Sequence, residues 1–213
     1  LLAMVALFFF IMQFDRKMMS DIRKVLLLAV IFLVTMMLCV LIAQINPYLA
    51  PVSMVLLLAA SLLSPSIAII GNMIALLLVS VLTNTAGTNF TQQLLYAMVS
   101  GVLSAPVGVY VVTRFKQQRA SVLLAGICMA VFNLLGMISI GLLTNNEAKT
   151  VLNNALWTAG SNILAAILCM GAQPILEWLF NLVTPFKLVE LSNPNQPLLR
   201  RLLVETPGTY HHS

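Results

Sequence analysis

Two adjacent histidines near the end of the chain, His211 and His212, are the residues best suited by type to metal chemistry. An imidazole nitrogen is a common ligand of divalent metals, and a bound metal ion can activate water for hydrolysis. Two histidines do not complete such a centre, and a histidine pair at a terminus is more often the remainder of a tag than a metal site. Their meaning therefore depends on the residues that precede them.

The apolar segments upstream hold almost no ionisable side chain, which disfavours several kinds of membrane chemistry. Charged groups inside a bilayer are costly and usually functional, yet the predicted spans contain no His, Asp, Lys or Arg, and Glu177 lies at a predicted boundary. A buried serine would lack a basic partner, and no pair of aspartates is present, so intramembrane proteolysis is disfavoured. Ion-coupled transport loses its usual carriers for the same reason.

The polar candidates that remain deep inside the spans are the asparagines Asn72, Asn133 and Asn162. They are accompanied by three prolines that can break or kink helices: Pro65, Pro106 and Pro174. Broken helices with buried amides can form a transport site, but amides also serve as hydrogen bonds between helices. We favour the second interpretation. Four glycines are expected where helices pack closely: Gly101, Gly108, Gly126 and Gly136.

The elements that would position these residues are transmembrane helices. Apolar residues make up 61% of the chain and charged residues only 8%, whereas soluble domains carry about a quarter charged residues. The net charge of +5 comes from basic residues in short breaks between apolar runs. Membrane orientation explains this charge better than a nucleic-acid partner does. We therefore expect an integral membrane protein whose first partner is the lipid bilayer.

The apolar runs predict an all-α, polytopic bundle of about seven transmembrane helices within residues 1–183. The predicted spans are 1–14, 25–43, 48–63, 66–82, 94–112, 120–143 and about 151–180. The first run rises only about 21 Å, which indicates a truncated span. A single helix over 48–82 would be too long, so the chain must break near Ser64-Pro65-Ser66, as a two-span hairpin or as a re-entrant loop.

The basic residues predict the orientation of the bundle. With alternating crossings, ten of the eleven Lys and Arg residues fall on one side, and Lys149 alone falls on the other. Basic loops face the cytoplasm, so the tail is expected there. Residues 184–208 are predicted to form a cytoplasmic linker with a short amphipathic juxtamembrane helix, which begins near Asn195 and stops near Glu205.

The tail also carries a family resemblance. Residues 191–199, LSNPNQPLL, and 205–213, ETPGTYHHS, closely resemble the membrane-to-catalytic junction of the bacterial seven-transmembrane HD phosphohydrolases. The predicted spans agree with the membrane domain of that family in number and order. The resemblance implies an extracellular region before these spans and a cytoplasmic HD domain that starts at 209–213. It also implies a bacterial cell (inner) membrane location.

Members of this family hydrolyse a cyclic dinucleotide, cyclic di-AMP, with a pair of divalent metals, commonly iron or manganese. By the resemblance, His212 is the first metal ligand, and His211 is the second choice. The remaining ligands, including the adjacent His-Asp pair, are not among residues 1–213, so this piece is expected to bind no metal and to be inactive alone. The function expected is that of an anchor and signal relay for the enzyme. The alternative is a small transporter or channel.

Overall fold

The computed structural model describes residues 21–83, 90–115, 118, 120–143, 147–182 and 188. In chain order the elements are α3 (Ile22–Ala43), η1 (Pro47–Leu49), α4 (Ser53–Leu62), α5 (Pro65–Leu82), α6 (Phe90–Arg114), α7 (Ser121–Leu143) and α8 (Ala148–Leu179). The predicted all-α, polytopic membrane bundle is confirmed. The first predicted span, the predicted juxtamembrane helix and both histidines lie outside the described residues.

The number of full crossings differs from the prediction of about seven. Within the described ranges, five helices are long and apolar enough to cross a membrane, namely α3, α5, α6, α7 and α8. The third predicted span instead holds the three-residue η1 and the ten-residue α4. Ten residues rise only about 15 Å, half of a bilayer core. Residues 48–82 therefore form neither two full-length helices nor a shallow re-entrant loop, because a broken segment of η1 and α4 is followed by α5, which is long enough to cross.

Local sequence sets where the helices begin and end. Asp21 caps α3 by accepting a hydrogen bond from the Arg23 amide at 3.2 Å. Pro65 opens α5 in the first turn, where its missing N–H costs nothing. Asn181, with a φ of 50°, closes α8 in a Schellman motif in which the Leu182 amide donates to the Glu177 carbonyl at 3.0 Å. The last span therefore ends in a turn before the tail.

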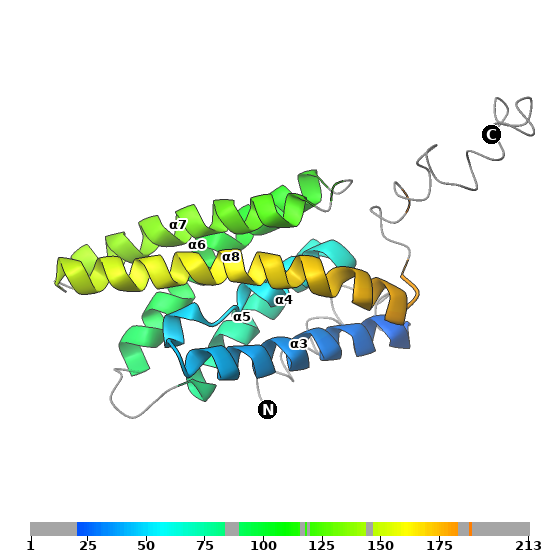
Figure 1. Cartoon of the computed structure of the whole chain (residues 1–213), viewed down its shortest axis with the longest axis horizontal. Coiled ribbons are helices and arrows are strands. Elements are labelled where there is room, and N and C mark those ends of the chain that lie inside the picture. The colour runs from blue at the N-terminus through cyan, green and yellow to red at the C-terminus, as the bar shows by residue number, and fades with distance from the viewer. Residues whose placement is uncertain are drawn as a thin grey trace, which may run out of the picture.

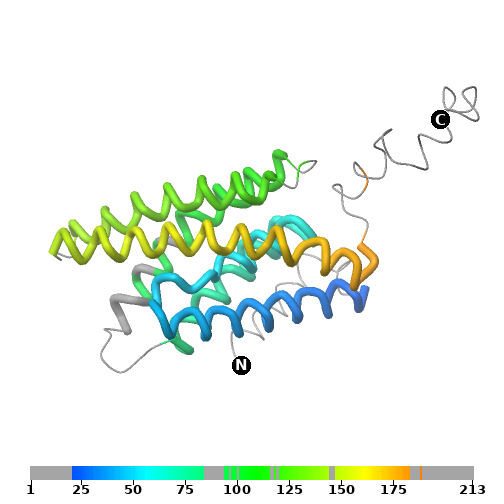
Figure 2. The backbone as a smooth tube through the Cα atoms, viewed as in Figure 1, coloured from blue at the N-terminus to red at the C-terminus, as the bar shows by residue number. Residues whose placement is uncertain are grey.

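The helices alternate in direction between two ends of the bundle (Figure 1). We call them the Arg114 end, where α3 and α7 begin and α6 and α8 finish, and the Lys149 end, where α8 begins. The same path can be followed along the tube in Figure 2. Arg23 and Lys24 lie at the start of α3 and therefore at the Arg114 end, opposite Lys149. The described basic residues thus divide between the ends as the orientation argument requires.

The short helix α4 lies in the middle of the bundle. It contacts α3, α5, α6 and α8, and its first eight residues are all buried. The non-helical residues that lead into it, Ala50 to Val52, are buried as well. Irregular backbone is tolerated at membrane depth only where protein covers it or where it borders a cavity. The irregular backbone before α4 is therefore expected to be covered by protein or to border a cavity.

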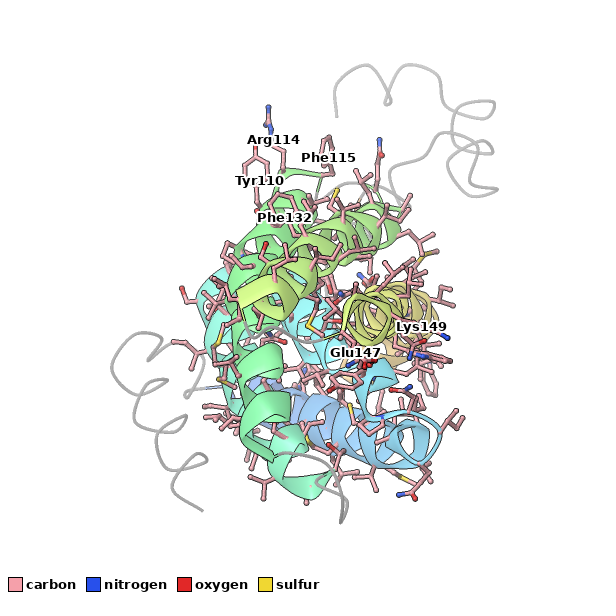
Figure 3. The ribbon with its side chains drawn as sticks, turned by 90° about the vertical axis from the view of Figure 1, so that its left-hand side faces the viewer. Tyr110, Arg114, Phe115, Phe132, Glu147 and Lys149 are labelled. Atoms are coloured by element: carbon pink, nitrogen blue, oxygen red, sulfur yellow. The ribbon has the colours of Figure 1, made fainter. Side chains whose placement is uncertain are left out.

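The outer faces of the long helices remain apolar. Large side chains such as Leu33, Val81 and Leu135 are mostly exposed, as expected for surfaces that meet lipid. Figure 3 looks onto the Lys149 end, with Glu147 and Lys149 at the start of α8, and shows Tyr110 and Phe132 pointing away from the bundle.

Between helices, the four glycines predicted at close contacts are confirmed, because an added Cβ at each would meet a side chain of another helix. The contacts are with Leu76 at Gly101, Met129 at Gly108, Ala166 at Gly126 and Leu103 at Gly136.

Candidate functional site

The three asparagines singled out in the sequence line one cavity inside the bundle, with a volume of about 70 Å³. Asn72 comes from α5, Asn133 from α7 and Asn162 from α8, so the site depends on three segments far apart in the chain. Ser53 at the start of α4 and Ser104 of α6 complete its polar wall. Since one water needs about 10–15 Å³ of such space, the cavity has room for several waters or a small ligand.

The cavity belongs to the half of the bundle nearer the Lys149 end. Pro47, the first residue of η1, and Thr83, after α5, line it at that end, and Asn72 lies deeper. Toward the Arg114 end the helices pack closely at Gly108, where an added Cβ would lie 3.0 Å from Leu56 and would also touch Met129.

Most hydroxyl groups of the wall donate to backbone carbonyls of their own helices. Ser80 Oγ donates to the Leu76 carbonyl at 2.7 Å, and Ser161 Oγ donates to the Thr158 carbonyl at 2.8 Å. Asn162 Nδ2 donates to that same carbonyl at 3.2 Å. These hydroxyl groups therefore offer oxygen lone pairs to the cavity, whereas the side-chain amides of Asn72 and Asn133 offer N–H donors as well.

Three oxygen atoms of the wall have no hydrogen-bond partner among the described residues: Ser53 Oγ, Asn72 Oδ1 and Asn133 Oδ1. Their residues are only 8%, 2% and 6% exposed, so bulk water does not solvate them. A buried polar atom without a partner costs free energy, more so inside hydrocarbon. The three residues that carry these atoms line a single cavity, which indicates a site that could hold a polar molecule.

This arrangement differs from the structural role that we favoured for the asparagines. The one described bond of Asn162 is within its own helix, and the carbonyl oxygens of Asn72 and Asn133 bond to no other helix in the described part. The serines and the two threonines of the wall were not singled out at all. One sequence signal was available: Ser53, Thr158, Ser161 and Asn162 all fall in the half of their predicted spans nearer one membrane face.

No charged side chain lines the cavity within the described residues. Glu177 is 3% exposed, so it is buried in the bundle near the end of α8, where it accepts a hydrogen bond from Gln173 Nε2 at 3.4 Å. The cavity can bind and orient a polar molecule, but its described wall offers no acid, base or nucleophile pair for catalysis.

The predicted metal ligands are not part of this site. His212 and the second choice, His211, lie outside the described residues. In the described ranges, no group of three or more His, Cys, Asp or Glu residues could hold a metal ion. The role of His212 as a metal ligand therefore stays a prediction.

Comparison with known proteins gives a family and two named relatives. A family model described as "7TM receptor with intracellular HD hydrolase" matches residues 1–184. The chain is 32% identical over 170 residues to a Bacillus subtilis (strain 168) protein named cyclic-di-AMP phosphodiesterase PgpH, covering 78% of this chain and 23% of the relative. It is 34% identical over 123 residues to the protein of the same name from Listeria monocytogenes serotype 1/2a (strain 10403S), covering 56% of this chain and 16% of the relative.

A third similarity is local. The chain is 59% identical over 46 residues to an uncharacterized protein, slr0104, of Synechocystis, which covers 22% of this chain and 6% of that protein. The chain spans less than a quarter of the length of the curated relatives it matches. No solved structure matches it.

Proposed function

The chain belongs to the family described as the 7TM receptor with intracellular HD hydrolase, and on this premise we propose that it is the membrane anchor and signal-relay domain of a cytoplasmic, metal-dependent phosphohydrolase. The observation that carries this proposal is the family match over residues 1–184 together with the likeness to two proteins named as cyclic-di-AMP phosphodiesterases. The substrate proposed is a cyclic dinucleotide, cyclic di-AMP, which the full-length protein would hydrolyse.

The proposed domain plan follows the sequence. Residues 1–183 form the membrane domain, 184–208 the cytoplasmic linker, and 209–213 the start of the HD domain. His212 is proposed as the first ligand of a pair of iron or manganese ions, with His211 as the second choice. Such a pair supplies Lewis-acid chemistry, which activates water and stabilises charge on the phosphodiester. In this plan the protein's own HD domain and an extracellular domain are its partners.

The proposed setting is the bacterial inner membrane with the carboxyl end in the cytoplasm. The described residues Arg23, Lys24 and Arg114 support this orientation, because they lie at the bundle end from which α8 leads into the tail.

Membrane vesicles of opposite sidedness test activity and orientation together. Cyclic di-AMP is charged and does not cross the bilayer, so inside-out vesicles with the full-length protein should hydrolyse it at least about tenfold faster than right-side-out vesicles. Detergent should remove the difference, and a chelator should abolish hydrolysis in both. Equal or reversed rates before detergent would contradict the orientation. A lack of linear dinucleotide even in detergent would contradict the function.

Relay through α8 is proposed because that helix runs the length of the bundle and ends at the turn before the tail. An added Cβ at Gly141 of α7 would lie 2.9 Å from the Cβ of Val151, which is shorter than the roughly 3.5–4.5 Å of a disulfide, so a small separation of the two backbones would allow one to form. In full-length protein, a Gly141→Cys and Val151→Cys disulfide should change the hydrolysis rate by roughly fivefold, reversibly on reduction. The two single-cysteine variants are the controls, and an unchanged rate in the oxidised pair would contradict relay.

The alternative function, a small transporter or channel, draws support from the polar cavity and the broken segment before α4. The close packing around Gly108 and Leu56 argues against a continuous path through the described helices. Anchoring and relay therefore remain the preferred function.

A further inference from the structure

The cavity contains the features of a built ligand site. Its three unpartnered oxygens are on side chains more than nine-tenths buried, and they come from α4, α5 and α7. The bonded hydroxyls and the Asn162 amide add further acceptor lone pairs. A ligand that satisfies this wall must donate hydrogen bonds to these oxygens and also accept them from the side-chain N–H groups of Asn72 and Asn133.

The charge of the ligand is limited by two features of the wall. No acidic or basic side chain lines the cavity within the described residues, so an ion would be buried without a partner. In addition, Ser53 is the first residue of α4, so the positive end of that helix dipole lies at the cavity. A cation is therefore disfavoured even though the wall is rich in oxygen acceptors.

We propose that the cavity formed by Ser53, Asn72, Ser104, Asn133, Thr158 and Asn162 binds a small, uncharged molecule that carries both N–H or O–H donors and an acceptor oxygen, and that enters from the Lys149 end. The volume of about 70 Å³ limits the bound part to a few non-hydrogen atoms, as in a primary amide or the tip of a polyol. Entry from that end follows from the position of Pro47 and Thr83 in the wall.

Three probe molecules of similar size test separately whether the ligand needs hydrogen-bond donors and whether it must be uncharged. Acetamide has two N–H donors and no charge, acetone has the same shape without donors, and methylammonium has donors with a positive charge. With the chain reconstituted in lipid nanodiscs, saturation-transfer NMR should show saturable binding of acetamide. Acetone and methylammonium should bind at least about tenfold more weakly, because each leaves a group without its partner. Equal binding of acetone, or stronger binding of methylammonium, would overturn the proposed ligand class.

A pair of matched variants locates the site. Asn72→Leu removes an unpartnered oxygen at nearly constant shape, so we expect an equal or higher melting temperature and roughly fivefold weaker acetamide binding. Asn153→Leu, at an exposed position of α8 outside the cavity, should leave binding unchanged. Acetamide binding that survives Asn72→Leu, or no saturable binding to the unsubstituted chain, would overturn the proposal and leave water as the occupant. Neither result bears on hydrolysis, so the proposed function is tested separately.

Discussion

Replacement of His212 by alanine in the full-length protein is expected to lower cyclic di-AMP hydrolysis by at least about 100-fold, because loss of a direct metal ligand costs more than the loss of a supporting contact. The expectation depends on the motif at residues 205–213, where His212 directly precedes Ser213. The measurement is the rate at which the linear product appears, made beside metal analysis of the purified protein. Metal content should fall together with activity.

His211→Ala is the matched control, since it removes the same side chain one position earlier. Its activity should stay within about tenfold of the unsubstituted protein, and its metal content should be unchanged. Reversal of the two results would assign the ligand to His211. If both variants kept full activity and full metal content, neither histidine would be a ligand, and the proposed start of the HD domain would be wrong.

The membrane class and the helical content could be predicted because they depend on local composition. A run of apolar residues long enough to cross hydrocarbon must satisfy its own backbone, which only a helix or a closed barrel can do. Local residue types also predict where an apolar run is interrupted, as at Pro65, which is the first residue of α5. The four glycines were recognisable because small residues in apolar helices usually mark close packing.

The cavity could not be predicted because it is a property of packing between helices. Asn72, Asn133 and Asn162 are separated by long stretches of chain, and each alone is compatible with an ordinary hydrogen bond between helices. Only the bundle shows that they share one space with Ser53. The apolar pattern also could not predict the length of α4, since residues 48–63 are mostly apolar whether or not they are helical.

The polar wall of the cavity and the apolar packing beneath it occupy different parts of the bundle. Acceptor oxygens gather toward the Lys149 end, whereas Leu56, Leu57 and Leu58 fill the middle of α4 with almost no exposure. An occupant of the cavity would contact α5, α7 and α8 at once, and α8 is the helix that leads to the tail. In the proposed relay, binding would act by changing how α8 packs against α7 and α4.

Gly126→Leu should strongly lower the stability of the described bundle, because it disrupts the contact between α7 and α8. An added Cβ at this position would touch Ala166 and lie 3.0 Å from the Asn162 carbonyl oxygen. Neither neighbour can move without shifting α8, so we expect a loss of about 1–3 kcal/mol or more in stability. A lower melting temperature of the nanodisc-embedded chain, followed by circular dichroism, measures it.

Gly171→Leu separates packing from helix propensity. Both substitutions replace glycine by leucine within a long helix, but an added Cβ at Gly171 meets nothing within 4 Å, and the residue is exposed on α8. Leucine is the better helix former by roughly 0.5–1 kcal/mol, so this variant should be neutral or more stable. Equal melting temperatures for the two variants would mean that α7 and α8 do not pack through Gly126. A lower value for Gly126→Leu alone would support the close contact on which relay through α8 depends.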